Sequence, residues 1–119
     1  MSKKILQAFY KAEALIHPEI LADFLHPEVI VEWRSTTGLI KMNYEELVEM
    51  STELSRAYVR SHIRVSHIIS DKDQVASRYS HFVRTLENPN EEILLAHFMA
   101  IWEFKDGKMY RGFQMSQVS

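Results

Sequence analysis

Four consecutive stretches decide the fold: residues 62–70 (HIRVSHIIS), 74–85 (QVASRYSHFVRT), 93–105 (ILLAHFMAIWEFK) and 108–118 (KMYRGFQMSQV). Apolar and polar side chains alternate along them with a period of two, which is typical of strands that bury one face. The connections DKD, ENPN and DG have the turn chemistry of antiparallel hairpins. The sequence therefore predicts a four-stranded antiparallel meander.

The helices precede this meander. Apolar residues recur at steps of three and four over residues 3–16, which predicts an amphipathic helix. A second, short helix is opened by Pro18 and ended by His26-Pro27. Alternation over residues 29–34 predicts a strand, and residues 39–42 are expected to form its short return strand.

A third helix completes the set. Asn43, followed three positions later by Glu46, forms a variant capping box that predicts a helix running to about Tyr58. Helices gathered ahead of a long antiparallel sheet indicate the α+β class. The last three strands are long enough to bend, so three helices packed on a curved, mainly antiparallel sheet should make a cone with an enclosed interior. The 119 residues fit one domain, residues 1–119.

Composition excludes several classes of protein. The chain is 46% hydrophobic and 25% charged, the balance of a folded globular domain rather than a disordered segment. No run approaches the roughly 20 apolar residues of a membrane span. The net charge of −2 without a basic stripe predicts no nucleic-acid partner. The chain has no cysteine, and its start does not have the pattern of a secretory signal, so we expect a cytoplasmic protein.

The order of elements and several local strings resemble the nuclear-transport-factor-2-like (NTF2-like) superfamily, and within it the SnoaL-like group. The resemblance rests on Leu25-His26-Pro27, the strand at residues 29–33, the helix start at residues 43–47 and the closing run at residues 104–109. It implies the cone-shaped fold. Members of this fold include isomerases, dehydratases, cyclases, epoxide hydrolases and binding modules, so the fold alone does not choose a function.

Ketosteroid isomerase chemistry is excluded residue by residue. The resemblance places the catalytic aspartate of those enzymes at Trp33, and their acidic oxyanion donor at Met99 or Ala100. Their helix tyrosine falls at Phe9, and we expect the neighbouring Tyr10 to point elsewhere. Without a base or an oxyanion donor, that reaction has no groups to run on.

Two other patterns of the superfamily match only in part. The pocket aspartate of SnoaL-type cyclases has no counterpart, because the final strand contains no acidic residue. Scytalone-dehydratase-like members use paired histidines and tyrosines. His62 resembles one of those histidines, whereas Arg84-Thr85 falls nearest the place of the second and His81 lies close to it.

The register that the resemblance implies gives the cone an interior lining. It directs Ser77, Tyr79, His81 and Val83 inward from one strand and mainly aromatic residues from the next. Such a lining suits a small, flat, mainly apolar molecule. The expected ligand-binding residues are Trp33, Phe98, Trp102, Gln114 and Ser116. The alternative is that these side chains simply fill a core.

His81 and Tyr79 are the candidate catalytic pair, with His62 as a third candidate. Two positions apart on one strand, His81 and Tyr79 share a face and can reach one ligand. A histidine with a pKa near neutrality exchanges protons, and a tyrosine donates to a developing oxyanion. The alternatives are a buried, structurally satisfied His81 and a solvated His62.

No metal or cofactor is predicted. His62 and His67 are five residues apart on a strand and therefore face opposite sides, and no His-Glu-x-x-His helix is present. Phosphate-binding loops and dinucleotide fingerprints are also missing from the sequence.

The opposite face of the sheet predicts a self-association surface. Phe82, Ile101, Phe113 and Met115 are expected on it, with Arg78 and Glu103 as a cross-strand ion pair. An apolar face of this kind is usually covered, so we predict a homodimer formed sheet against sheet.

Two functions therefore stand open: a cofactor-free acid–base enzyme of the isomerase, dehydratase or cyclase type, and a non-catalytic ligand-binding or dimerisation module.

Overall fold

The computed structural model describes residues 1–118. Its helical elements are α1 (Ser2–Lys11), a short 3₁₀ helix η1 (Ala14–Ile16), α2 (Pro18–Phe24) and α3 (Tyr44–Ala57). Its strands are β1 (Leu25–Ser35), β2 (Gly38–Asn43), β3 (Tyr58–Asp71), β4 (Gln74–Thr85), β5 (Ile93–Lys105) and β6 (Lys108–Gln117). The six strands form one sheet in the order β2-β1-β6-β5-β4-β3.

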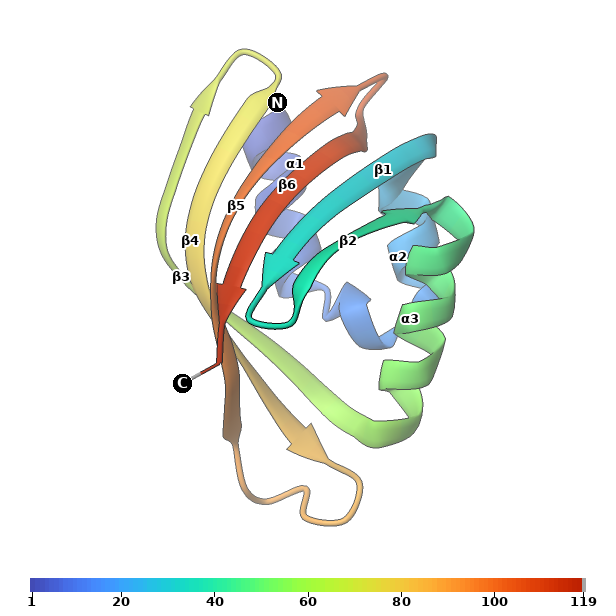
Figure 1. Cartoon of the computed structure of the whole chain (residues 1–119), viewed down its shortest axis with the longest axis vertical. Helices are drawn as coiled ribbons and strands as arrows, with labels where there is room; N and C mark the ends of the chain where they lie inside the picture. Colours follow the sequence, from blue (N-terminus) through green and yellow to red (C-terminus); the bar gives the residue numbers. More distant parts are fainter. Residues whose placement is uncertain (119) are drawn as a thin grey trace.

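The long strands curve around the helices, as Figure 1 shows. Every neighbouring pair is antiparallel except β1 and β6, which are parallel. The helices cover the concave face, and the predicted cone-shaped α+β fold is confirmed. Within the described residues no helix is long and apolar enough to cross a membrane.

The capping box at the start of α3 is confirmed in both directions. The backbone N–H of Glu46 donates to Oδ1 of Asn43 at 3.0 Å, and the Asn43 N–H donates to Oε1 of Glu46 at 2.9 Å. Two of the amide groups that a helix start leaves without partners are thereby satisfied.

The prediction of one helix over residues 3–16 is wrong. The helix ends at Lys11, and Glu13 adopts a left-handed backbone with φ of 54°, which no continuous right-handed helix can contain. Its carboxylate accepts a hydrogen bond from the backbone N–H of Ser61 at 2.8 Å, so a tertiary contact compensates the break. His26-Pro27 lies inside β1 rather than at a helix end.

The predicted ion pair between Arg78 and Glu103 is also wrong. The register of β4 against β5 sets Arg78 opposite Met99, and Glu103 opposite Gln74. Arg78 instead donates to Oγ of Ser66 on β3 at 3.1 Å. A register difference of four residues moves the two charges too far apart to pair.

Candidate ligand cavity

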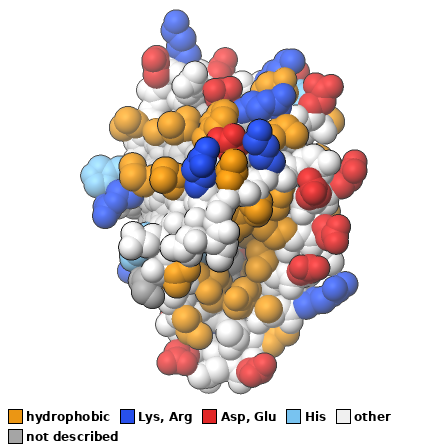
Figure 2. Space-filling view, in the orientation of Figure 1, with side chains coloured by type: hydrophobic (Ala, Val, Ile, Leu, Met, Phe, Trp, Pro, Cys, Tyr) orange, Lys and Arg blue, Asp and Glu red, His pale blue; other side chains and the backbone are white. Residues whose placement is uncertain are grey.

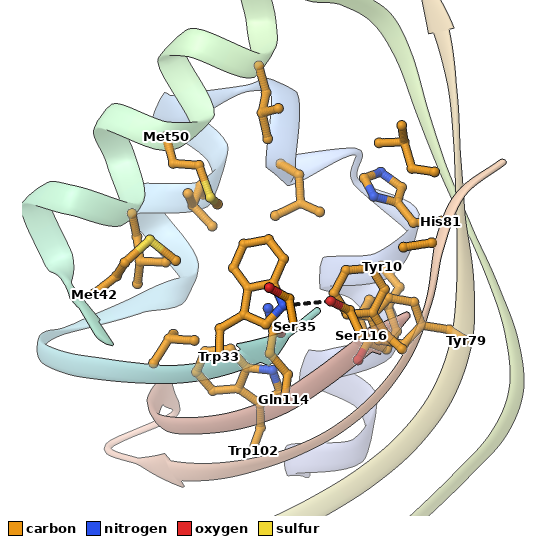
Figure 3. Close-up of a pocket in the computed structure, with 18 of the residues that line it drawn as sticks. Tyr10, Trp33, Ser35, Met42, Met50, Tyr79, His81, Trp102, Gln114 and Ser116 are labelled. Carbon is orange, nitrogen blue, oxygen red and sulfur yellow. Dashed lines mark hydrogen bonds between the residues drawn. The ribbon is translucent and has the colours of Figure 1, made fainter. Parts of the chain in front are cut away.

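A cavity of about 480 Å³ lies between the concave face of the sheet and the helices. Figure 3 shows its side chains converging from α3 on one side and from the strands on the other. The lining reaches the surface at the turn between β1 and β2, at the C-terminal part of α3 and at the end of β6. Hydrophobic side chains gather near this opening in Figure 2.

The lining carries no formal charge. It is mostly aliphatic and aromatic, and none of its described residues is an Asp, Glu, Lys or Arg. An uncompensated charge is costly to bring into such a medium. The lining therefore offers no opposite charge that could compensate a buried ion.

All five predicted ligand-binding residues contribute to this lining. Trp33, Phe98, Trp102, Gln114 and Ser116 lie around the cavity on β1, β5 and β6. The indole N–H of Trp33 donates to Oγ of Ser116 at 2.8 Å, which fixes the plane of that ring. Gln114 lines the cavity and forms no side-chain hydrogen bond within residues 1–118.

Trp102 lies flat over the backbone of β6. Its cross-strand neighbour is Gly112, and a Cβ built on that glycine would come within 2.6 Å of the Trp102 ring. Only a glycine leaves room for the indole in this position. Phe98 stacks on Tyr79 with ring centroids 5.0 Å apart and planes 8° apart, so the cavity has flat aromatic walls.

Tyr10 also lines the cavity, and the expectation that it points elsewhere is wrong. Its hydroxyl shares a 2.7 Å hydrogen bond with Oγ of Ser77, and its ring lies 4.9 Å from that of Tyr79. Burial raises its pKa to about 12, although the bond to Ser77 lowers it. The signal in the sequence was the spacing of four between Leu6 and Tyr10, which places both on the buried face of α1.

Tyr79 is the second tyrosine in the lining of the cavity. No side-chain hydrogen bond to its hydroxyl is formed within residues 1–118, and no buried side-chain oxygen there lacks a partner, so this oxygen must retain accessible surface. Burial first, and the neighbouring Tyr10 second, raise its pKa well above the usual value. The hydroxyl is therefore protonated at neutral pH and can donate a hydrogen bond.

His81 is buried beside Tyr79, and its Nε2 shares a 2.7 Å hydrogen bond with Oγ of Ser61. Burial lowers its pKa to about 4, below the near-neutral range in which a histidine exchanges protons most readily. The pairing of β4 with β5 shifts register just after His81, with Leu95 as the extra residue. Irregularities of this kind re-aim the neighbouring side chains.

The structure does not bring His62 to the cavity. This side chain is exposed on β3, and its Nδ1 lies 3.5 Å from a carboxylate oxygen of Glu92. His62 lines a separate polar groove together with Arg60 and Arg84. Successive residues of a strand face opposite sides, so His62 and its buried neighbour Ser61 diverge. In residues 1–118, no cluster of three or more His, Asp or Glu side chains is placed to hold a metal ion.

The cone and its lined interior define the NTF2-like class of fold. Residues 6–112 match the SnoaL-like domain family, and the chain belongs to it. No curated protein matches the sequence significantly.

Solved structures agree with this assignment. IdmH from Streptomyces antibioticus, described as a "putative polyketide cyclase", superposes with a TM-score of 0.75 at 14% identity, covering 98% of this chain and 91% of that one. A protein of ketosteroid isomerase-like fold from Catenulispora acidiphila, in complex with trimethylamine, superposes with a TM-score of 0.71 at 11% identity, covering 92% of this chain and 82% of that one. An NTF2-like protein from Burkholderia pseudomallei superposes with a TM-score of 0.67 at 12% identity, covering 95% of this chain and 88% of that one. At such identities the likeness establishes the fold alone.

Proposed function

We propose that this protein binds one small, neutral, flat and mainly apolar molecule in its cavity. The observation that carries the proposal is an uncharged cavity of about 480 Å³ whose mostly aliphatic and aromatic lining includes a few polar side chains, among them Tyr79, His81 and Gln114. This volume lies within the range of ligand sites, roughly 300 to 1,000 Å³. A filled core would not leave that space.

The lining gives each predicted residue a role. Trp33, Phe98 and Trp102 supply flat walls for an aromatic or conjugated frame. Ser116 orients Trp33 by accepting the indole N–H, and its own O–H remains available as a donor. Tyr79, His81, Gln114 and the Ser116 hydroxyl can hydrogen-bond a polar substituent.

A cofactor-free acid–base enzyme is the second candidate function. It is favoured by the shared position of Tyr79 and His81 on the inward face of β4. In this scheme Tyr79 donates to a developing oxyanion and His81 exchanges the proton. The low pKa makes His81 a weak base, and the lining holds no carboxylate, so binding is the better supported function. His62, the third catalytic candidate, lies outside the cavity and takes no part in this scheme.

Native mass spectrometry followed by denaturation tests the binding proposal. We expect a small mass to be released on denaturation. Intrinsic fluorescence provides a second readout, because both tryptophans of the chain line the cavity. A neutral probe, 2-acetylnaphthalene, should therefore change the emission on titration.

A matched pair of variants makes the titration specific. Ala96 lines the cavity, and Ala96→Phe should fill the space and abolish the probe signal. Ala8 is exposed on α1, and Ala8→Phe should leave the titration unchanged. Absence of a released mass together with a flat titration of the unsubstituted protein would refute the cavity as a binding site. Turnover with a pH dependence that vanishes in His81→Gln would establish the second candidate.

We also propose a cytoplasmic homodimer formed through the outer face of the sheet. Ile101, Phe113 and Met115 are 45%, 39% and 62% exposed there, and Glu32, Arg34 and Arg78 lie around them. A rim with both signs of charge can pair with itself across a two-fold axis. Phe82 is half-buried under the Arg64 guanidinium and adds less apolar surface.

Light scattering tests the dimer. Ile101→Asp should give a monomer, whereas Leu86→Asp, at an exposed position in the β4–β5 connection, should not. An unchanged dimer in Ile101→Asp would place the interface elsewhere.

A further inference from the structure

A buried serine and a buried histidine form an isolated pair behind the cavity wall. Ser61 on β3 is 1% exposed, and its Oγ lies 2.7 Å from Nε2 of His81 on β4. The bond to His81 is the one side-chain hydrogen bond this hydroxyl makes within residues 1–118. His81 borders the cavity, whereas Ser61 borders the polar groove on the other side.

The environment decides the direction of this hydrogen bond. If Nε2–H donated to Ser61, the buried serine hydroxyl proton would have no acceptor within residues 1–118. A buried donor without a partner costs far more than an acceptor oxygen that keeps an unused lone pair. Ser61 therefore donates and Nε2 accepts, and a neutral imidazole then carries its single proton on Nδ1.

Nδ1 is the ring nitrogen that meets the cavity. It has no hydrogen-bond partner within residues 1–118, and since no buried side-chain nitrogen there lacks one, it must retain accessible surface. Figure 3 shows the His81 ring extending from β4 toward the cavity, on the same side as Tyr79. Strand β4 thus presents two hydrogen-bond donors to the cavity, the Tyr79 O–H and the His81 Nδ1–H.

We infer that Ser61 is a positioning residue that fixes His81 as the Nδ1–H tautomer, and that the cavity takes a molecule with a carbonyl-type acceptor on a flat apolar frame. The inference about the acceptor on the bound molecule rests on the proposed binding function, whereas the inference about the tautomer does not. In this state His81 is a donor to the ligand rather than a base.

Glu13 holds Ser61 in place. Its Oε1 accepts the backbone N–H of Ser61 at 2.8 Å, and its Oε2 lies 3.1 Å from Nη2 of Arg60. These contacts tie the start of β3 to the segment between α1 and η1. Because the Ser61 backbone is fixed from that side, its hydroxyl stays directed at His81.

Nitrogen-15 NMR of the histidine side chains tests the tautomer without any ligand. At pH 7 the His81 resonances, assigned by their loss in His81→Gln, should show a protonated Nδ1 and an unprotonated Nε2. Ser61→Ala should shift the population toward the Nε2–H form, and Ser61→Thr, which keeps the hydroxyl, should restore the original pattern. Ser77→Ala is the matched control, because that buried serine bonds Tyr10 instead and the His81 pattern should not change.

A pair of probes of nearly equal shape tests the acceptor. We expect 2-acetylnaphthalene to bind about tenfold more tightly than 2-ethylnaphthalene, the effect of a single net hydrogen bond. In Ser61→Ala this ratio should fall to about threefold or less. Equal binding of the two probes overturns the acceptor inference but leaves the binding function intact.

The remaining outcomes are also decisive. An Nε2–H tautomer in the unsubstituted protein overturns the role of Ser61 whether or not any probe binds. If neither probe binds, the proposed function fails, and the tautomer is still judged by the NMR spectrum.

Discussion

Replacement of Gly112 by alanine tests the packing beneath the cavity. The added Cβ would lie 2.6, 2.8 and 2.8 Å from three carbons of the six-membered ring of Trp102. These separations are shorter by roughly 1 Å than ordinary carbon contacts. Trp102 is buried, so its ring cannot swing into solvent and must move toward the cavity.

The expected cost follows from two opposing terms. Overpacking of a core site costs about 1–3 kcal/mol, and the lower entropy of an unfolded chain with alanine returns about 0.4–1 kcal/mol. The net loss should be about 1–2 kcal/mol in the free energy of unfolding. For a chain of this length that is a fall of about 4–8 °C in Tm.

Urea denaturation with a double-mutant cycle is the assay. Trp102→Phe removes the ring carbons that the new methyl group would meet, so the two substitutions together should cost less than their sum by about 1 kcal/mol or more. Gly107→Ala is the control. It is also unfavourable, because φ at Gly107 is 74°, but it has no contact that Trp102→Phe could relieve.

Two results would refute this reasoning. One is a Gly112→Ala variant as stable as the unsubstituted protein. The other is strict additivity with Trp102→Phe, which would mean that the loss arises elsewhere than in this contact.

Three further predictions concern pH, backbone strain and capping. Between pH 6.5 and about 4 the unfolded chain protonates His81 while the folded chain does not, so the free energy of unfolding should fall as the pH falls, by up to about 3 kcal/mol. Urea titrations at several pH values measure this fall, and it should be missing in His81→Gln. Glu13→Ala keeps the left-handed backbone strain and removes the acceptor for the Ser61 N–H, so thermal melts should show a loss of about 1–3 kcal/mol in the free energy of unfolding. Glu13→Gly relieves the strain and should lose less stability. Equal losses in the two variants would exclude a contribution from strain. Asn43→Ala should cost about 1 kcal/mol by chemical denaturation, and Asn43→Asp almost nothing, because aspartate also caps.

The sequence by itself determined the features that depend on local pattern. Period-two alternation located β4 to β6, and Asn43 with Glu46 located the start of α3, because strand burial and helix capping are set by residues close together in the chain. Alternation put Tyr79 and His81 on one face of β4, and the register implied by the family resemblance directed that face inward.

Tertiary structure alone decided the features that depend on contacts across the chain. The break at Glu13 is compensated by the backbone N–H of Ser61, 48 residues later, and no local pattern predicts that contact. The register of β4 on β5 separated Arg78 from Glu103, and successive side chains of β3 sent His62 outward and Ser61 inward.

The chemistry of His81 shows the same division most clearly. Its place on an inward face was implied by the register of the family that the sequence resembles. Its low pKa, by contrast, comes from burial, and its proposed tautomer comes from a hydroxyl 20 residues away on the neighbouring strand. Desolvation and hydrogen bonding are properties of an environment that folding assembles. The sequence therefore places the residue, and only the folded protein determines its protonation state and tautomer.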